Sequence, residues 1–158
     1  MKICGVDPGL TGAIAFIDES LGKSLADFTI VDAPRMKVGR GGGALSGTVL
    51  AATLRDAAPD LVVIERQQAM PRQGVSSTFK IGYGAGLYLG ICIALGLRVT
   101  VVHPRVWQRE MYQGAEGEGK DRSLFVARLL FPTADLPRGK SGRADALLLA
   151  EYGRRKFT

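Results

Sequence analysis

Apolar residues in the first part of the chain form short runs of strand length. The segment Lys2–Val6 is rich in residues that favour strands and ends at Asp7-Pro8-Gly9, where proline cannot continue a ladder. The next apolar run, Gly12–Asp18, follows so closely that only a hairpin connects the two, which makes them antiparallel. A turn near residues 19–23 and a third strand over about Ser24–Ala33 are predicted to follow.

Farther along the chain, helical segments alternate with strands. The segment TVLAATLRDAA predicts a helix ended by Pro59, and the run Leu61–Glu65 has the length and apolar character of a buried parallel strand. A helix over about Ser76–Leu95 leads into a fifth strand in RVTVVHP. Further helices are predicted at residues 105–112, 120–131 and 143–155.

This order of elements predicts a single α/β domain over residues 1–158. Three antiparallel strands followed by βαβ crossovers give a five-stranded mixed sheet with helices covering its faces. The apolar stretches are too short for a membrane span, and the N-terminus lacks the features of a signal peptide. We therefore expect a cytoplasmic protein that does not associate with membranes.

Two features interrupt the pattern. The segment Pro34–Gly47 contains Arg35, Lys37 and Arg40 with three consecutive glycines, which predicts an exposed, mobile basic loop. The helix predicted over Ser76–Leu95 carries four interior glycines, and each costs about 1 kcal/mol relative to alanine. Such glycines indicate close approach by another backbone, from either the sheet or a second subunit.

Composition narrows the classes of partner and site. The formal net charge is +6, which favours a polyanionic partner such as nucleic acid. Cys4 and Cys92 lie far apart in apolar segments, and His103 is the only histidine. We therefore expect buried, inert thiols rather than a zinc site or a structural disulfide.

Three carboxylates occupy positions that matter for chemistry. Asp7 and Glu65 end strands that are neighbours in the predicted sheet, so both project from one edge. Two close carboxylates repel, and a divalent cation bound by oxygen ligands, Mg²⁺ or Mn²⁺, relieves the conflict. Asp145 is the acid near the start of the last helix. Singly, each has a structural explanation: a turn, an ion pair with Arg66 or Arg72, and the helix dipole. Their joint placement favours a metal site.

The motifs GVDPGLTGAIAF, VVIE and RADALLLA, in this order and at these distances, resemble the RuvC family of Holliday-junction resolvases, especially its shorter phage-type members. The resemblance covers nearly the whole chain. It implies an RNase H-like fold, a homodimer, and hydrolysis of four-way DNA junctions with two Mg²⁺ ions per site, for which Mn²⁺ substitutes. Carried over by motif, Asp7 would bridge both ions, Glu65 would ligate one and Asp145 the other. No small-molecule cofactor is implied.

The chain departs from the family in one respect. RuvC proteins usually carry a fourth acid or a histidine about one helical turn before the last aspartate. Here that stretch reads Lys140, Ser141, Gly142 and Arg143. Ser141 could at most hold a metal-bound water, and Asp135 lies in a loop expected to be too distant. Either three carboxylates suffice with water completing the coordination, or the site is weakened or inactive.

The resemblance also assigns roles to basic and apolar residues. Lys120 stands where the family often has a functional lysine near the scissile phosphate, and Gln108 stands where it often has a second one. Arg105 or Arg109 is expected to substitute for that second lysine. Independently of the resemblance, the basic residues expected to contact DNA phosphates are Arg35, Lys37 and Arg40 in the first loop and Arg66, Arg72 and Lys80 beyond Glu65. Some relatives insert an aromatic wedge after the glutamate motif. Met70 is the apolar residue there, and we expect it to be buried. Trp107 is expected to pack beneath the site, and His103 to be structural.

The function predicted from the sequence is therefore a metal-dependent, structure-selective DNA endonuclease that resolves Holliday junctions or other branched DNA. Two alternatives stay open. One is a non-catalytic, junction-binding dimer with a weakened metal site. The other is an RNase H-type hydrolase of RNA–DNA hybrids, which the glycine-bearing helix disfavours.

Overall fold

The computed structural model describes residues 1–18, 27–39, 42–115 and 118–157. Its main sheet has five strands in the order β3-β2-β1-β6-β7. These strands are β1 (Lys2–Asp7), β2 (Ala13–Asp18), β3 (Phe28–Asp32), β6 (Leu61–Glu65) and β7 (Val99–Val102). The pairs β1–β2 and β2–β3 are antiparallel, whereas β1–β6 and β6–β7 are parallel. The predicted mixed sheet is thus confirmed.

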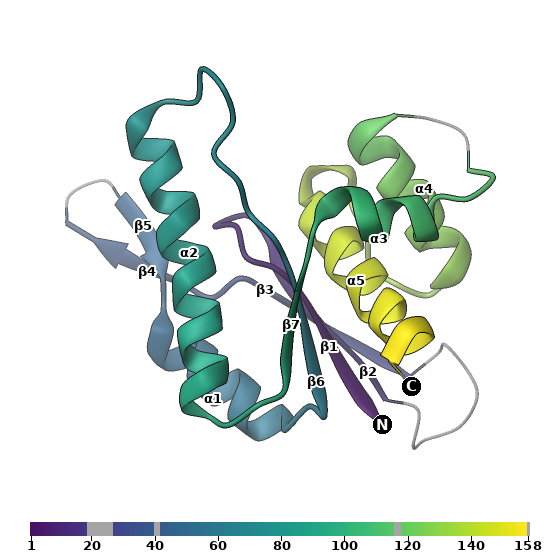
Figure 1. The fold of residues 1–158 in the computed structure, drawn as a ribbon, viewed down its shortest axis with the longest axis horizontal. Coiled ribbons are helices and arrows are strands. Elements are labelled where there is room, and N and C mark those ends of the chain that lie inside the picture. Colours follow the sequence, from purple (N-terminus) through teal and green to yellow (C-terminus); the bar gives the residue numbers. More distant parts are fainter. Residues whose placement is uncertain (19–26, 40–41, 116–117, 158) are drawn as a thin grey trace.

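Helices cover both faces of this sheet (Figure 1). They are α1 (Gly47–Ala57), α2 (Val75–Ala94), α3 (Pro104–Met111), α4 (Gly119–Leu130) and α5 (Ser141–Phe157), and a short 3₁₀ turn (Arg138–Lys140) precedes α5. Helices α1 and α2 lie on one face, and α5 lies on the other with α3 and α4 beyond it. None of the described helices is both long and apolar enough to cross a membrane.

The central strand β1 contributes to two separate cores because its side chains alternate between the faces. Ile3 belongs to the core beneath α5, whereas Cys4 and Val6 belong to the core beneath α1 and α2. Both cysteines are buried as expected, and burial raises the pKa of each thiol, that of Cys92 to about 11. A strand buried on both faces reads as a continuous apolar run.

Helix α5 lies directly on the backbone of β1. A Cβ atom at Gly5 would stand 2.1 Å from the carbonyl oxygen of Ala146 and 2.4 Å from the nitrogen of Ala150. Gly153, farther along α5, makes the same kind of approach: a Cβ there would stand 2.7 Å from Cγ2 of Val63. These glycines allow α5 to press against the strands, which fixes where its first turns stand over the edge of the sheet.

The prediction of a loop over Pro34–Gly47 is wrong for the described residues. They form a separate antiparallel hairpin of β4 (Arg35–Val38) and β5 (Gly42–Leu45), in which Arg35 pairs with Leu45. The alternation in RMKV is a strand pattern that the glycine-rich composition concealed, and the buried Leu45 anchors it. Arg40 lies outside the described residues, as do the turn predicted near residues 19–23 and the first residues of the predicted third strand.

The glycines of α2 fall into two groups. A Cβ atom at Gly84 would stand 2.8 Å from the carbonyl oxygen of Pro8, so this glycine accommodates the turn after β1. Added Cβ atoms at Gly82, Gly86 and Gly90 would meet no described atom within 4 Å. The expected close approach by the sheet therefore accounts for one glycine of the four.

Candidate functional site

The ends of β1 and β6 bring two carboxylates to the same edge of the sheet. Val6 is in register with Ile64 in this parallel pair, and the next residues are Asp7 and Glu65. Asp145 lies near the start of α5, which crosses β1 close to its end. These three acidic side chains come from distant parts of the sequence, and the charges of Asp7 and Asp145 both act on Glu65.

Burial and mutual repulsion perturb these carboxylates. Burial, followed by the charges of Asp7 and Asp145, raises the pKa of Glu65 to about 7. Burial raises the pKa of Asp145 to about 6, and the charge of Asp7 adds to this increase. The pKa of Asp7 is raised by burial as well. Three partly desolvated acids that oppose one another's ionisation form a site prepared for positive charge.

Neutral donors hold Glu65 in place. The indole Nε1 of Trp107 donates a hydrogen bond to Oε1 at 3.1 Å, and Nε2 of Gln67 donates to Oε2 at 3.0 Å. The sequence suggested Arg66 or Arg72 as an ion-pair partner, and neither takes this role. Trp107 is fully buried beneath the site as predicted, but its hydrogen bond to Glu65 spans 42 residues of sequence and no local pattern announces it.

Asp145 is held from a different helix. The hydroxyl of Ser123, on α4, donates a short hydrogen bond to Oδ1 of Asp145. Ser123 adjoins Tyr112, whose ring meets the ring of Trp107 edge-on with centroids 5.6 Å apart. The pair of Tyr112 and Trp107 therefore connects Ser123, which holds Asp145, to the indole that holds Glu65. Sequence analysis did not single out Ser123 or Tyr112.

The turn after β1 encloses Asp7. The backbone nitrogen of Gly9 donates to Oδ1 at 3.3 Å. A Cβ atom at Gly142 would stand 2.8 Å from Oδ2 of Asp7 and 2.7 Å from Cα of Gly12. Any side chain at position 142 would therefore collide with this turn. The helix α5 thus approaches Asp7 through a glycine at the position one turn before Asp145.

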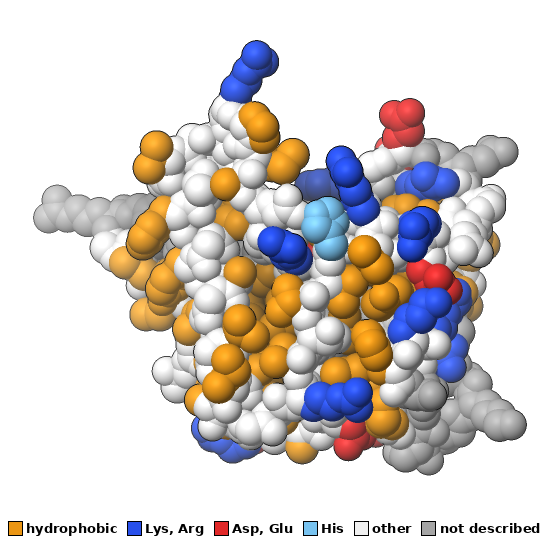
Figure 2. Space-filling model, viewed as in Figure 1, with side chains coloured by type: hydrophobic (Ala, Val, Ile, Leu, Met, Phe, Trp, Pro, Cys, Tyr) orange, Lys and Arg blue, Asp and Glu red, His pale blue; other side chains and the backbone are white. Residues whose placement is uncertain are grey.

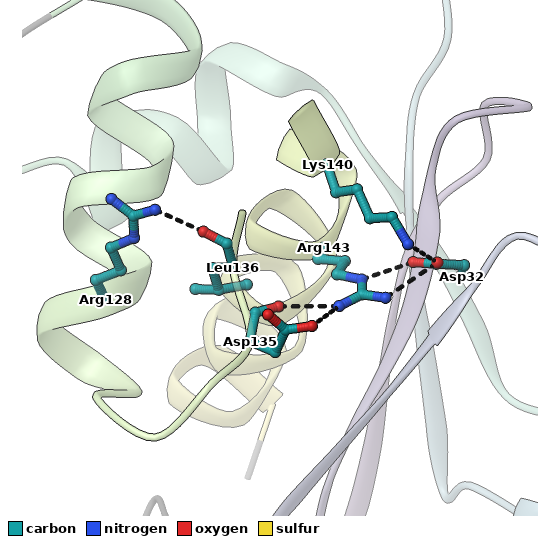
Figure 3. A network of polar contacts seen from close by, with 6 residues as sticks. All are labelled: Asp32, Arg128, Asp135, Leu136, Lys140 and Arg143. Carbon is teal, nitrogen blue, oxygen red and sulfur yellow. Dashed lines mark hydrogen bonds and ion pairs between the residues drawn. The ribbon is translucent and has the colours of Figure 1, made fainter. Parts of the chain in front are cut away.

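An ionic network secures the start of α5 to the edge strand β3 (Figure 3). Arg143 binds both oxygens of Asp32, with Nε 2.6 Å from Oδ1, and Lys140 reaches Oδ2 of the same residue at 2.5 Å. The two cations hold the pKa of Asp32 well below its usual range. Arg143 also binds Asp135 at 2.5 Å, so this carboxylate takes part in the ionic network. This network places Asp145, two residues beyond Arg143.

One lysine shares the site. Lys120, at the start of α4, lines a cavity of about 300 Å³ together with Asp145, Ser123, Tyr112 and Gln108. Its charge lowers the pKa of both Asp7 and Asp145, against the effect of burial. The structure thus brings Lys120 to the carboxylates, where a phosphate would need a counter-charge.

The other basic residues singled out from the sequence are exposed around this edge. Arg66 and Arg72 lie in the loop after β6, Arg105 and Arg109 on α3, and Arg35, Lys37 and Lys80 on the hairpin and α2. Within the described part of the chain none of them makes an ion pair. Figure 2 shows Lys and Arg side chains on both sides of the histidine.

Two further expectations have opposite outcomes. Met70 was expected to be buried, but it is 65% exposed. It opens a tight turn closed by the bond from the nitrogen of Gln73 to its carbonyl oxygen at 3.1 Å, with Arg72 at a positive φ of 66°. The structural role of His103 is confirmed, because its ring caps α3 by accepting a bond from the nitrogen of Arg105 at 3.2 Å.

The donor set suits a divalent cation, although no group of three ligating side chains within the described ranges is placed to hold one ion together. The available donors are carboxylate oxygens, which Mg²⁺ and Mn²⁺ prefer. The hydrogen bonds that orient Glu65 and Asp145 come from the uncharged groups of Trp107, Gln67 and Ser123. Lys120 is the cation that lowers the pKa of Asp7 and Asp145, and the hydrogen-bond donors themselves add no positive charge.

No protein-family model and no curated protein sequence matches this chain. Solved structures do match it. RuvC of T. thermophilus in complex with a Holliday junction substrate is 21% identical with a TM-score of 0.69, and the match covers 100% of this chain and 97% of that one. Another structure of Thermus thermophilus RuvC gives 19% identity and a TM-score of 0.63, over 98% and 96% of the two chains.

A yeast mitochondrial Holliday junction resolvase is 12% identical with a TM-score of 0.59, over 97% of this chain and 77% of that one. These similarities extend over essentially the whole of the present chain. They confirm the RuvC-type, RNase H-like fold that the sequence motifs predicted.

Proposed function

We propose that this protein is a metal-dependent endonuclease that resolves four-way or other branched DNA. The observation that carries the proposal is the convergence of Asp7, Glu65 and Asp145, all with raised pKa values, at one edge of a RuvC-type fold. One structure with this fold is a complex with a Holliday junction substrate. The net charge of +6 suits such a polyanionic partner.

Two divalent ions, Mg²⁺ with Mn²⁺ as a substitute, fit the carboxylates better than one. Mg²⁺ is usually held by one or two carboxylates and keeps several waters, and the described residues offer no group of three ligands around a single ion. Two ions that share Asp7 need only one further carboxylate each, Glu65 for one and Asp145 for the other. Ions held by these residues would supply the activation of water and the stabilisation of the leaving 3′ oxygen.

The chain's own residues bind and orient the DNA. Lys120 places its ammonium beside Asp145, where it stabilises negative charge on the scissile phosphate. Phosphates farther along the arms are contacted by the exposed residues Arg35, Lys37, Arg66, Arg72, Lys80, Arg105 and Arg109, and by Arg40 beyond the described ranges. Such contacts position the DNA without reading its sequence.

Symmetric cutting of a junction requires two sites, and we propose that α2 forms the dimer interface. Val75, Phe79 and Ile93 are exposed on the face of α2 that carries Gly82, Gly86 and Gly90. Small residues with open space in front of them allow two helices to approach closely, and the apolar residues would be buried between them. A twofold axis through this face would give a self-complementary contact.

A second candidate function is a junction-binding dimer that does not cut. The collision at Gly142 favours it, because this position cannot supply a fourth ligand without moving the turn at Gly12. A site with fewer protein ligands binds its ions less tightly, so catalysis is the property most at risk.

Cleavage assays separate these functions. The protein is incubated with a four-way junction, a flap, a plain duplex and an RNA–DNA hybrid, each with Mg²⁺, Mn²⁺ or EDTA. Paired symmetric nicks confined to branched DNA and abolished by EDTA are the expected result. Preferential cutting of the hybrid would contradict the proposal, and junction binding without cutting would favour the second candidate.

The matched variant for this assay is Asp7→Asn. It removes a charge at the metal site while keeping the shape and the hydrogen bond from Gly9. Cutting should be abolished and junction binding in EDTA should be retained, as measured by fluorescence anisotropy. Loss of both would show that Asp7 serves the fold instead.

A further inference from the structure

The residue that supports Asp145 lies on α4 rather than on α5. Ser123 is 2% exposed, and its hydroxyl donates to Oδ1 of Asp145. On α5 itself, the position one turn before Asp145 is Gly142, which the turn at Gly12 closes to any side chain. We propose that Ser123 is a positioning residue that fixes the Asp145 carboxylate for metal binding; this inference rests on the proposed function. A side chain at position 142 could not give this support.

Packing alone does not explain a serine at this position. The neighbouring residues on the buried side of α4 are apolar: Leu124, Val126 and Ala127. Alanine would fill the same space and favours a helix more strongly than serine. A buried hydroxyl is retained in such surroundings only where it has a polar partner. The partners of Ser123 are Asp145 and Tyr112.

The contact constrains one carboxylate oxygen and leaves the other available. Oδ1 of Asp145 accepts the bond from Ser123, and Oδ2 accepts none from the described residues. The terminal torsion of an aspartate has a broad energy profile, so the carboxylate would rotate without a donor. With Oδ1 held, Oδ2 keeps a constant direction, which is the contribution that hydrogen bonds behind a ligand make at metal sites.

The support of Asp145 also joins the support of Glu65. Tyr112 lies between Ser123 and Trp107, in side-chain contact with the first and edge-on to the second. Trp107 donates to Glu65. The proposed ligands of the two different ions therefore share one buried set of supports on α3 and α4, and Ser123 is the member that touches Asp145.

The test compares Ser123→Ala and Ser123→Thr with the wild type in the full-length protein. Mn²⁺ binding is measured without DNA by isothermal titration calorimetry and by the rise in unfolding temperature on adding Mn²⁺. We expect Ser123→Ala to weaken Mn²⁺ binding about 10- to 100-fold. Ser123→Thr keeps the hydroxyl and should restore binding. Junction binding in EDTA should be unchanged.

The control for general damage is Val126→Ala, one turn along the same buried side of α4. It lowers stability by loss of packing and should leave Mn²⁺ affinity within about twofold of the wild type. Unchanged Mn²⁺ binding in Ser123→Ala, or an equal loss in Val126→Ala, would overturn the inference. Absence of Mn²⁺ binding by the wild type would instead show that the proposed function itself fails, and the inference with it.

Discussion

Helices α2 and α5 lie on opposite faces of the sheet, and both carry glycines (Figure 1). In α5 both glycines are in close contact with the sheet side of the fold: Gly142 meets the turn after β1, and Gly153 meets Val63. At α2 three glycines face open space, exemplified by Gly86. Along the same face, Val75 and Phe79 are 88% and 72% exposed.

Glycines therefore have different structural consequences in the two helices. In α5 the absence of side chains brings the helix backbone down onto the sheet, and this contact carries Asp145 to Asp7. In α2 the same absence leaves a surface that nothing in the described chain covers. The residue type is identical in the two helices, and only the neighbours distinguish a glycine that allows close packing from one that faces open space.

The largest effect expected from this comparison is on folding. Gly5→Ala should lower the free energy of unfolding by at least about 3 kcal/mol, because the added methyl group meets the backbone of α5, which cannot move aside alone. Gly86→Ala is the matched change on the open face, and should be neutral or stabilising by up to about 1 kcal/mol. Urea unfolding of both variants measures the difference. Equal destabilisation would remove the distinction between the faces.

The second effect is on assembly. Gly86→Arg places a long charged side chain in the open face and should weaken dimerisation at least about a hundredfold, or about 2.7 kcal/mol, while leaving the fold intact. Sedimentation velocity over a range of concentrations measures the dimer, and circular dichroism checks the fold. Ser77→Arg, on an exposed position across the helix, is the control. A wild-type protein that stays monomeric over the whole concentration range would contradict the proposed dimer.

The main sheet and the places of Asp7 and Glu65 could be predicted because both depend on local order, whereas Asp145 was singled out mainly by the resemblance of its motif to the RuvC family. Strand-length apolar runs that end in Asp7 and Glu65 determine the register of these residues at one edge. The same locality explains the errors. Glycine-rich composition hid the alternation in the β4–β5 hairpin, and an apolar side chain at Met70 suggested burial although the loop directs it outward.

The residues that hold the carboxylates could not be predicted from the sequence, because their contacts join distant parts of the chain. Trp107 meets Glu65 across 42 residues of chain, and Ser123 meets Asp145 across 22. Such pairs are set by how α3 and α4 dock beside α5, and no periodicity encodes that docking. Likewise, the collision at Gly142 follows from a contact with Gly12, which only the three-dimensional fold reveals.

The smallest expected effect is the loss of stability caused by ionisation of the buried carboxyl group of Glu65. The pKa of Glu65 is about 7 in the folded protein, above its ordinary value of 4.5. Between these values the folded state binds more protons than the unfolded state, so stability falls as pH rises through this range. The metal-free protein should therefore lose about 2 kcal/mol of stability between pH 5 and pH 8. Thermal unfolding in EDTA across this range measures the loss.

Glu65→Gln separates this cost from general effects of pH. The amide cannot ionise, so the variant should unfold at a higher temperature than the wild type at pH 8 in EDTA, by the equivalent of about 2 kcal/mol, and should show a flatter pH profile. Mn²⁺ should raise the unfolding temperature of the wild type at pH 8 much more than that of the variant, because the ion relieves the same repulsion that the substitution removes. A Glu65→Gln variant that is less stable than the wild type in EDTA at pH 8 would contradict this prediction. The hydrogen bonds from Trp107 and Gln67 to the carboxylate would then stabilise the folded protein by more than the buried charge destabilises it.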